Sequence, residues 1–253
     1  MLQSVLSPIP TFAMSAFELH VGVCKQIQSE LTRFWWDSPD GKKKICWKAW
    51  DQLTLPKQLE GLGFRDIQLF NQALLGKIAW RLITKPDCLL AKVLLGKYCH
   101  KTPFLKATQP QSFSHSWKGI LHGRDLLLTH LGKTIGDGED TKVWTDSWIH
   151  PKLDVKVFRP TLERDQDLMV ADLLSRETKE WNKAKVDNLL PELSSLILSI
   201  HPSKKGVLDT YIWTQQESGV YTAKSGYFTA RMDKIQSTSP LLNLERWNWQ
   251  KFV

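Results

Sequence analysis

The sequence predicts a mainly α protein with two small β-hairpins, an α+β arrangement. Apolar residues recur at spacings of three and four through most of the first 131 positions, as on the buried face of a helix. Short β-prone runs flank a turn rich in Gly, Asp and Glu in 134–149. In 210–228, aromatic and polar residues alternate around a Glu-Ser-Gly turn, so the sequence indicates two hairpins. Between them, residues 150–166 lack periodicity and contain two prolines. We therefore expect a helical region at 1–149, a linker at 150–166 and a smaller mixed segment at 167–253.

Charge is unevenly distributed along the chain. Its 253 residues are enough to bury a sizeable core. The net charge is +8, yet 42–106 alone carries 13 Lys/Arg against 4 Asp/Glu, a local +9. Residues 151–200 carry 8 against 9, a local −1. A basic block of this kind favours a polyanionic partner, nucleic acid first and an acidic membrane surface second. The alternative is a solvated basic face with no partner.

Several classes of protein are disfavoured. The four cysteines are widely spread with no C-x-x-C pair, which argues for reduced thiols and against a zinc site. No run of 18 apolar residues occurs, so we expect no membrane span. The opening residues have no basic stretch and are interrupted by Pro8 and Pro10, unlike a secretory signal. The compartment stays open between nucleus and mitochondrion.

The N-terminal helices begin with a stripe over residues 11–36, running into Phe-Trp-Trp. Its apolar positions are Phe17, Val21, Cys24, Ile27, Leu31 and Phe34. A second, short helix is predicted after the turn and triple lysine that follow, with Trp47 and Trp50 three positions apart. Large aromatics at helical spacing usually lie in a core, and we expect the same of these two and Trp80.

The central helix is predicted to follow Gly61 and Gly63, with Asp66 as its N-cap. Its apolar stripe then extends from Ile67 to Leu82, and Pro86 disfavours helical angles at the preceding residue. Three cations lie at four-residue intervals on a different face: Lys77, Arg81 and Lys85. The pattern indicates a buried helix with a basic flank.

Further helices are predicted at 88–99 and 114–131. In the first, Leu90, Val93, Leu94 and Tyr98 are expected to face inward; in the second, Gly123 is a candidate kink. Helices are also expected at 170–175 and 185–200, the latter broken or opened by Pro191, and at 225–235 with Ser225 as cap.

Catalytic patterns are not evident in the residues. Phosphoryl-transfer chemistry requires carboxylates that converge on Mg²⁺, and the chain has no Asp-Asp pair. The densest acidic cluster is better explained by the preference of acidic residues for turns than by a metal site. It consists of Asp137, Glu139, Asp140 and Asp146. No nucleophile elbow, P-loop or dinucleotide fingerprint occurs. We therefore predict a chain that is not an enzyme by itself, with no catalytic residue, metal, cofactor or small-molecule substrate.

The positive signal is lysine interleaved with aromatic residues, since nucleic-acid grooves combine cations for phosphates with rings for unpaired bases. Trp35 and Trp36 are the candidate stacking residues. The candidate phosphate contacts are Lys42, Lys43, Lys44, Lys48, Lys77, Arg81, Lys85 and Lys92.

Four ordered segments also carry a family resemblance: FWWDSPDGKKKICWKAWDQLTLPK, EGLGFRDIQLFNQALLGKIAWRLI, WKGILHGRDLL and IGDGEDTKVWTDSWI. They resemble the region downstream of the polymerase domain in plant LINE-type (non-LTR) retrotransposon reverse transcriptases, and small plant mitochondrial reading frames similar to pieces of such elements. YIWTQQESGVYTAKSGYF resembles the segment that leads into that family's zinc-binding domain. The resemblance implies that the catalytic palm and the zinc ligands lie outside this sequence.

Three functional hypotheses follow. The first is a non-catalytic fragment of a reverse transcriptase-like protein that binds RNA or DNA through a basic helical face. The second is a relic reading frame with no selected biochemical function. The third is an accessory subunit of a polymerase supplied in trans.

Overall fold

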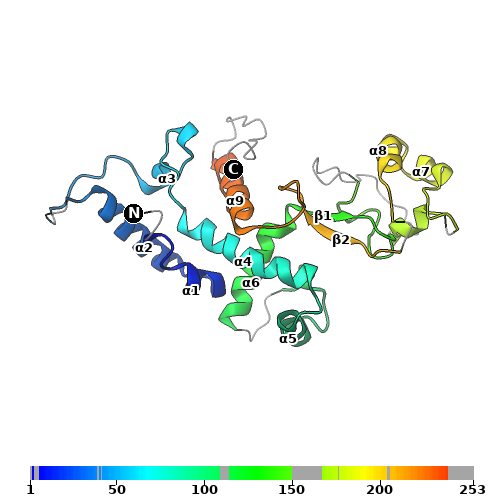
Figure 1. Cartoon of the computed structure of the whole chain (residues 1–253), viewed down its shortest axis with the longest axis horizontal. Coiled ribbons are helices and arrows are strands. Elements are labelled where there is room, and N and C mark those ends of the chain that lie inside the picture. The colour runs from blue at the N-terminus through cyan, green and yellow to red at the C-terminus, as the bar shows by residue number, and fades with distance from the viewer. Residues whose placement is uncertain are drawn as a thin grey trace. The chain divides into compact units, whose positions relative to one another are not determined.

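The computed structural model describes residues 2, 6–38, 40, 42–108, 114–149, 167–175, 177–203 and 206–238. These residues form helices α1 to α9 and two short strands, β1 and β2 (Figure 1). The predicted class, mainly α with a small β part, is confirmed. No helix in the described ranges is both long enough and apolar enough to cross a membrane.

The chain packs as two units, each assembled from separate stretches of sequence. The first comprises Met1–Gly76, Ser112–Leu126 and Thr222–Val253, and the second Lys77–Gln111 and Leu127–Tyr221. The linker predicted at 150–166 falls outside the described residues. The sequence-based division into 1–149 and 167–253 therefore stays a prediction.

The first unit contains α1 (Thr11–Ala16), α2 (Val21–Trp36), α3 (Trp50–Leu53), the N-terminal half of α4 (Ile67–Thr84), most of α6 (His115–Leu128), and α9 (Ala223–Thr238). Its core brings together side chains from α1 to α4 and from the segment between α3 and α4. The buried members are Leu2, Met14, Cys24, Leu31, Leu53, Phe64 and Ile67.

The helix predicted over 11–36 is broken between α1 and α2, and Asn71 of α4 holds the break. The buried Asn71 amide nitrogen donates to the carbonyl oxygens of Met14 (2.6 Å) and Phe17 (2.9 Å). Its oxygen accepts from the Leu19 amide (2.8 Å). His20 then caps α2, its Nδ1 accepting from the Gly22 amide (3.1 Å). Long-range hydrogen bonds thus replace the helical ones that periodicity alone predicts.

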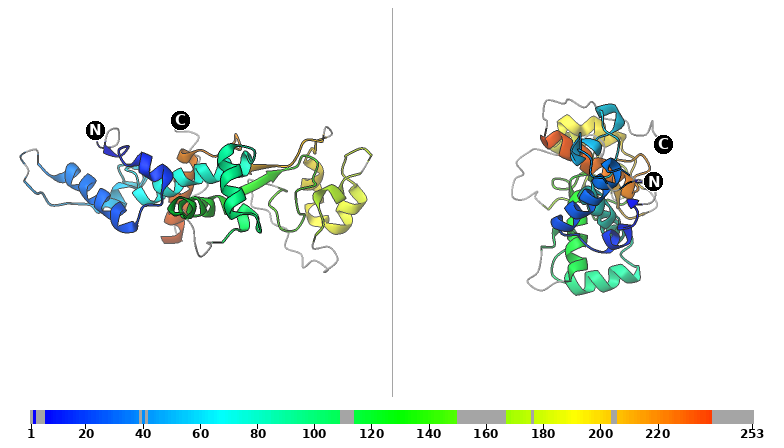
Figure 2. Two further views of the ribbon diagram at one scale, coloured as in Figure 1. Left: turned by 90° about the horizontal axis from the view of Figure 1, so that it is seen from below. Right: turned by 90° about the vertical axis from the view of Figure 1, so that its left-hand side faces the viewer.

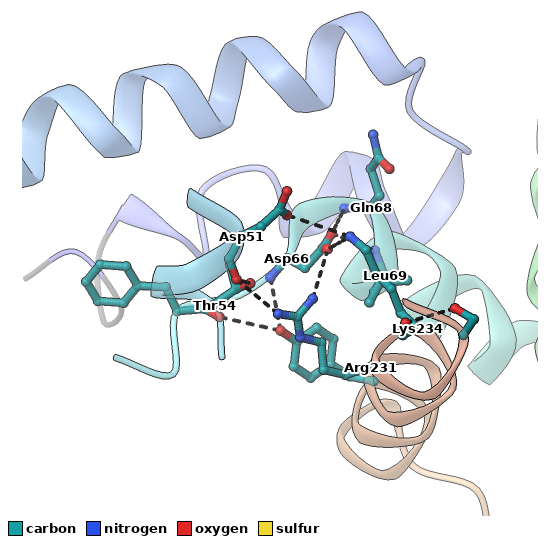
Figure 3. Close-up of polar contacts among 10 residues, drawn as sticks. Asp51, Thr54, Asp66, Gln68, Leu69, Arg231 and Lys234 are labelled. Atoms are coloured by element: carbon teal, nitrogen blue, oxygen red, sulfur yellow. Dashed lines mark hydrogen bonds and ion pairs between the residues drawn. The ribbon is translucent and has the colours of Figure 1, made fainter. Parts of the chain in front are cut away.

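The α4 helix begins as predicted, with Asp66 as its cap. Asp66 Oδ1 accepts from the amides of Gln68 (3.0 Å) and Leu69 (3.3 Å) (Figure 3). Its other oxygen, Oδ2, lies 2.8 Å from Lys234 Nζ and 3.7 Å from an Arg231 guanidinium nitrogen. Both cations belong to α9. The cap therefore also joins the start of α4 to a helix much later in the chain, through a carboxylate that is 2 % exposed.

The α6 helix continues through Gly123 and crosses α4 at close range. A Cβ atom added at Gly123 would lie 2.4 Å from the Gly76 nitrogen and the Leu75 carbonyl carbon. One added at Gly119, a turn earlier, would lie 2.9 Å from the Glu18 nitrogen. Gly123 therefore permits backbone contact between two helices, and α6 runs through it without a break in its helical assignment.

At the start of α9, Thr222 takes the capping position that the sequence assigned to Ser225. The Ser225 amide donates to Thr222 Oγ1 (3.0 Å), and the Thr222 amide donates to Ser225 Oγ (3.1 Å). This reciprocal pair is a capping box with serine at its third position, and it moves the helix start two residues earlier than predicted.

In the second unit, the two predicted hairpins are replaced by one sheet. Strands β1 (Leu131–Thr134) and β2 (Thr210–Trp213) pair antiparallel, with Leu131 opposite Trp213 and Thr134 opposite Thr210. The two strands lie side by side in Figure 1, and the left view of Figure 2 turns the same sheet by 90°. β2 lies within the second predicted hairpin (210–228), whereas β1 precedes the first one (134–149) and shares only Thr134 with it. Each strand pairs with a distant partner instead of its sequence neighbour.

Asp209, immediately before β2, explains this pairing. Its Oδ1 accepts from the amides of Gly136 (2.6 Å) and Gly138 (3.0 Å), and its Oδ2 accepts from the Thr141 hydroxyl. The GDG turn after β1 is thus organised by a carboxylate from another part of the chain. A local hairpin would leave these two amides without that acceptor.

The part of the second unit after β1 has a core of its own, to which α7 (Lys183–Leu189) and α8 (Ser194–Ser199) contribute. The predicted break at Pro191 is confirmed, because a 3₁₀ turn over Pro191–Leu193 separates the two helices. The helix predicted at 170–175 is a 3₁₀ turn over Val170–Leu173. The buried residues are Ile135, Val143, Trp148, Ile149, Val170, Leu173, Val186, Leu190 and Ile197.

Candidate nucleic-acid interface

The eight predicted phosphate contacts fall into two groups. The loop group lies in the first unit between α2 and α3, and consists of Lys42, Lys43, Lys44 and Lys48. The helix group lies in the second unit and consists of Lys77, Arg81, Lys85 and Lys92. All eight residues are exposed, and no ion pair joins any of them to another residue in the described ranges.

The loop group has no regular secondary structure, and its first residues are anchored to the end of α2. The Ser38 amide donates to the Lys42 carbonyl oxygen (3.1 Å), and the Lys44 amide donates to Asp37 Oδ1 (3.1 Å). On the other side, Trp50 opens α3 and packs against Phe64 with ring centroids 5.6 Å apart. Residues 45–49, between these anchors, are all exposed.

Trp47 corrects the prediction that both tryptophans of this stretch lie on a short helix in the core. The α3 helix begins only at Trp50, and Trp47 lies before it with 79 % of its surface exposed. Trp50 and Trp80 are covered, as expected of large aromatics. The prediction treated Trp47 and Trp50 as two positions on one helix. It was wrong because α3 does not extend back to Trp47.

The two predicted stacking residues differ in their surroundings, although both lie in the last turn of α2. Trp35 is 44 % exposed and meets Phe64 edge-on, with ring centroids 5.1 Å apart. Trp36 is half-buried and packs against the core of the first unit. A base could reach the open face of Trp35, whereas Trp36 is occupied by packing. Their role in stacking stays a prediction.

In the helix group, Lys77, Arg81 and Lys85 share a face of α4 and its C-terminal end. Successive members are four residues apart, and the Lys85 amide still donates to the Arg81 carbonyl oxygen (2.9 Å). The apolar residues between them, Trp80 and Leu82, are buried. The basic flank predicted for this helix is therefore confirmed as an exposed surface.

Lys92 belongs to α5 (Leu89–Tyr98), whose orientation differs from the prediction. Leu90 and Val93 were expected to face inward, but they are 36 % and 58 % exposed. Ala91 is the buried residue of this helix. Periodicity identifies residues that share a face, and it does not tell which face is covered.

Arg81 also influences a cysteine. Cys88 precedes α5, and its pKa lies below the usual thiol value, first because of the Ala91 backbone amide and then because of the Arg81 side chain. We expect the pH midpoint of Cys88 alkylation by iodoacetamide, followed by peptide mass spectrometry, to rise in R81Q. The K77Q variant, which removes a charge from the same face, should leave it unchanged. An identical midpoint in wild type and R81Q would contradict the assignment.

The acidic cluster of the 136–146 turn has structural partners. Asp146 Oδ2 accepts from Lys133 Nζ (2.9 Å) and from the Lys142 amide (3.1 Å), and Asp137 accepts from the Glu139 amide (3.2 Å). Within the described residues, no three His, Cys, Asp or Glu side chains are grouped so that they could hold a metal ion. These contacts agree with turn chemistry.

Sequence reasoning placed Trp47 in the core instead of on the surface, and it missed Asn71, Asp209 and Arg231. Asn71 and Asp209 are polar residues whose partners lie far away in sequence, so no local pattern marks them. Trp47 had a usable signal, because lysines lie on both sides of it at Lys44 and Lys48.

Comparison with known proteins places the chain in a plant protein family. The "Uncharacterized mitochondrial protein AtMg00310" of Arabidopsis thaliana is 44 % identical over 142 residues, which cover 56 % of this chain and 92 % of that protein. The chain belongs to the same family. The Arabidopsis "Putative ribonuclease H protein At1g65750" is 28 % identical over 242 residues. That match covers 92 % of this chain but 38 % of the relative. No family model and no solved structure matches the sequence.

Proposed function

We propose that this chain is a non-catalytic part of a retrotransposon-derived, reverse transcriptase-like protein, and that it binds RNA or DNA through its basic groups. The observation that carries the proposal is the exposure of all eight cations of the loop and helix groups, none of them in an ion pair with another described residue. These side chains can bind phosphates without first breaking an intramolecular ion pair. In doing so they release cations condensed on the nucleic acid, and this release favours association.

The two relatives support an origin from a retroelement but do not identify the type of element. One relative is named as a ribonuclease H protein, which is an activity on nucleic acid, and this chain spans just over a third of its length. The four sequence segments that resemble LINE-type reverse transcriptases give the finer assignment. On this proposal, 1–149 is a thumb-like or linker region, 150–166 a connector, and 167–253 the approach to a zinc-binding domain.

Charge reversal in the helix group tests the proposal. The K77E/R81E variant should bind a labelled single-stranded RNA or DNA roughly tenfold more weakly, because it loses two phosphate contacts. The salt slope of log K should fall by about 1.4, at about 0.7 per contact on a single strand. Fluorescence anisotropy from 50 to 200 mM salt measures both quantities.

A matched control is K183E/K224E, which makes the same change in net charge at exposed lysines outside both groups. It should leave affinity and slope nearly unchanged. Equal losses in the two double variants would show that only net charge matters. Absence of binding by the wild-type chain would refute the proposal and favour the relic reading frame. Cleavage of an RNA–DNA hybrid in Mg²⁺ by the purified chain would refute its non-catalytic part.

A further inference from the structure

Trp47 is the most exposed tryptophan in the part of the chain that the structure describes. Trp117 and Trp213 are fully buried and Trp148 is 2 % exposed, whereas Trp47 is 79 % exposed. Burying a large aromatic side chain is among the strongest stabilising contributions available to a fold. An indole left outside the core therefore contributes little to folding and is available to a partner.

The surroundings of Trp47 indicate what that partner is. Lys48 is its neighbour, Lys42, Lys43 and Lys44 precede it, and all four are exposed. Ile45, two residues before Trp47, is 74 % exposed and adds a smaller apolar surface near the indole. A ring flanked by cations fits a ligand that has flat apolar faces and a regular negative charge. An unpaired stretch of nucleic acid has both properties.

The loop is also built to present this ring. Hydrogen bonds from Ser38 and Lys44 fix its first residues to the end of α2, and Trp50 fixes its last residues against Phe64. The residues between these anchors make no contact that would bury Trp47. Figure 1 shows this segment as an irregular loop between α2 and α3. A loop with exposed lysines on both sides of an exposed ring lets cations meet phosphates while the ring meets a base.

We propose that residues 42–48 form a site for single-stranded RNA or DNA, in which the Trp47 indole stacks on an unpaired base and the four lysines contact the flanking phosphates. This rests on the proposed function and deepens it, because it selects unpaired strands over duplexes. In a duplex both faces of every internal base are already stacked, so the indole gains nothing without opening the helix.

The test compares W47A with wild type on a labelled 20-nucleotide oligo(U) and on a blunt duplex, by fluorescence anisotropy of the full chain. Base–aromatic stacking contributes about 1–3 kcal/mol, which corresponds to a loss of about 5- to 150-fold; we expect about tenfold on the single strand. Duplex affinity should change less than about twofold. The salt slope should not change, because no charge is removed. W47F should retain most of the affinity.

The matched control is F12A, which removes a ring that is 88 % exposed in α1, away from the lysines of the loop in sequence. It should bind like wild type. If wild type binds the single strand and W47A binds equally well, the stacking site is refuted while the proposed function stands. If wild type binds neither ligand, both are refuted. Equal losses by W47A on strand and duplex would also overturn the site.

Lysines around an exposed tryptophan can also meet an anionic membrane, and a second arm separates the two. Co-sedimentation with vesicles of phosphatidylcholine and phosphatidylserine should not depend on Trp47. Vesicle binding that W47A abolishes, together with unchanged oligo(U) binding, would assign the loop to a lipid surface and refute the proposal. Photocrosslinking to 5-iodouracil-substituted RNA should label Trp47, and a crosslink confined to other residues would contradict it.

Discussion

Replacing Asp66 with alanine should lower the free energy of unfolding by about 3–5 kcal/mol, the cost of removing one partner from a buried ion pair. Arg231, whose side chain is 6 % exposed, would keep its hydrogen bond to the Asp51 carbonyl oxygen (3.1 Å) but lose its carboxylate. The start of α4 would lose its cap at the same time, a smaller loss of about 1 kcal/mol. Urea unfolding followed by circular dichroism measures the change.

Two further variants separate these contributions. Lys234, which also pairs with Asp66, has its Nζ 3.7 Å from Asp51 Oδ1 (Figure 3). The Asp51 side chain, however, is 78 % exposed. D51A should therefore cost less than about 1 kcal/mol. D66N keeps a side chain that can cap the helix but removes the negative charge. If the ion pair dominates, D66N should therefore destabilise the protein almost as much as D66A. Equal destabilisation by D66A and D51A would refute the role of burial.

The sequence predicted best those elements whose determinants are local. The α4 helix carries its own cap in Asp66, its own apolar stripe and a proline just beyond its end, so its bounds follow from neighbouring residues. The break at Pro191 is local in the same sense. By contrast, β1 pairs with β2, and Asp209 beside β2 binds Gly136 and Gly138 in the turn after β1. Asp209 and Gly136 are 73 residues apart, so no local pattern predicts that they meet.

The candidate site shows the same division. Exposure of its lysines and its arginine follows from their charge, since unpaired charges are rarely buried. The placement of aromatics does not follow from type alone, because Trp35, Trp36, Trp47 and Trp50 lie in one short stretch and differ widely in exposure. Where α2 ends and α3 begins decides which of these rings a ligand can reach, and those two boundaries depend on contacts with Asp37 and Phe64.

Glycine at position 123 should be required for the α4–α6 crossing. The same substitution at a second glycine should not destabilise the protein and serves as the control. Alanine favours an isolated helix over glycine by up to about 1 kcal/mol. G123A should nevertheless destabilise the protein by about 1–3 kcal/mol, because its Cβ would lie 2.4 Å from the α4 backbone, where no side chain can rotate away. At Gly96 in α5 an added Cβ has nothing within 4 Å, so G96A should be neutral or stabilising in the same urea experiment. Stabilisation by both variants would mean that the two helices do not approach as closely as the structure shows.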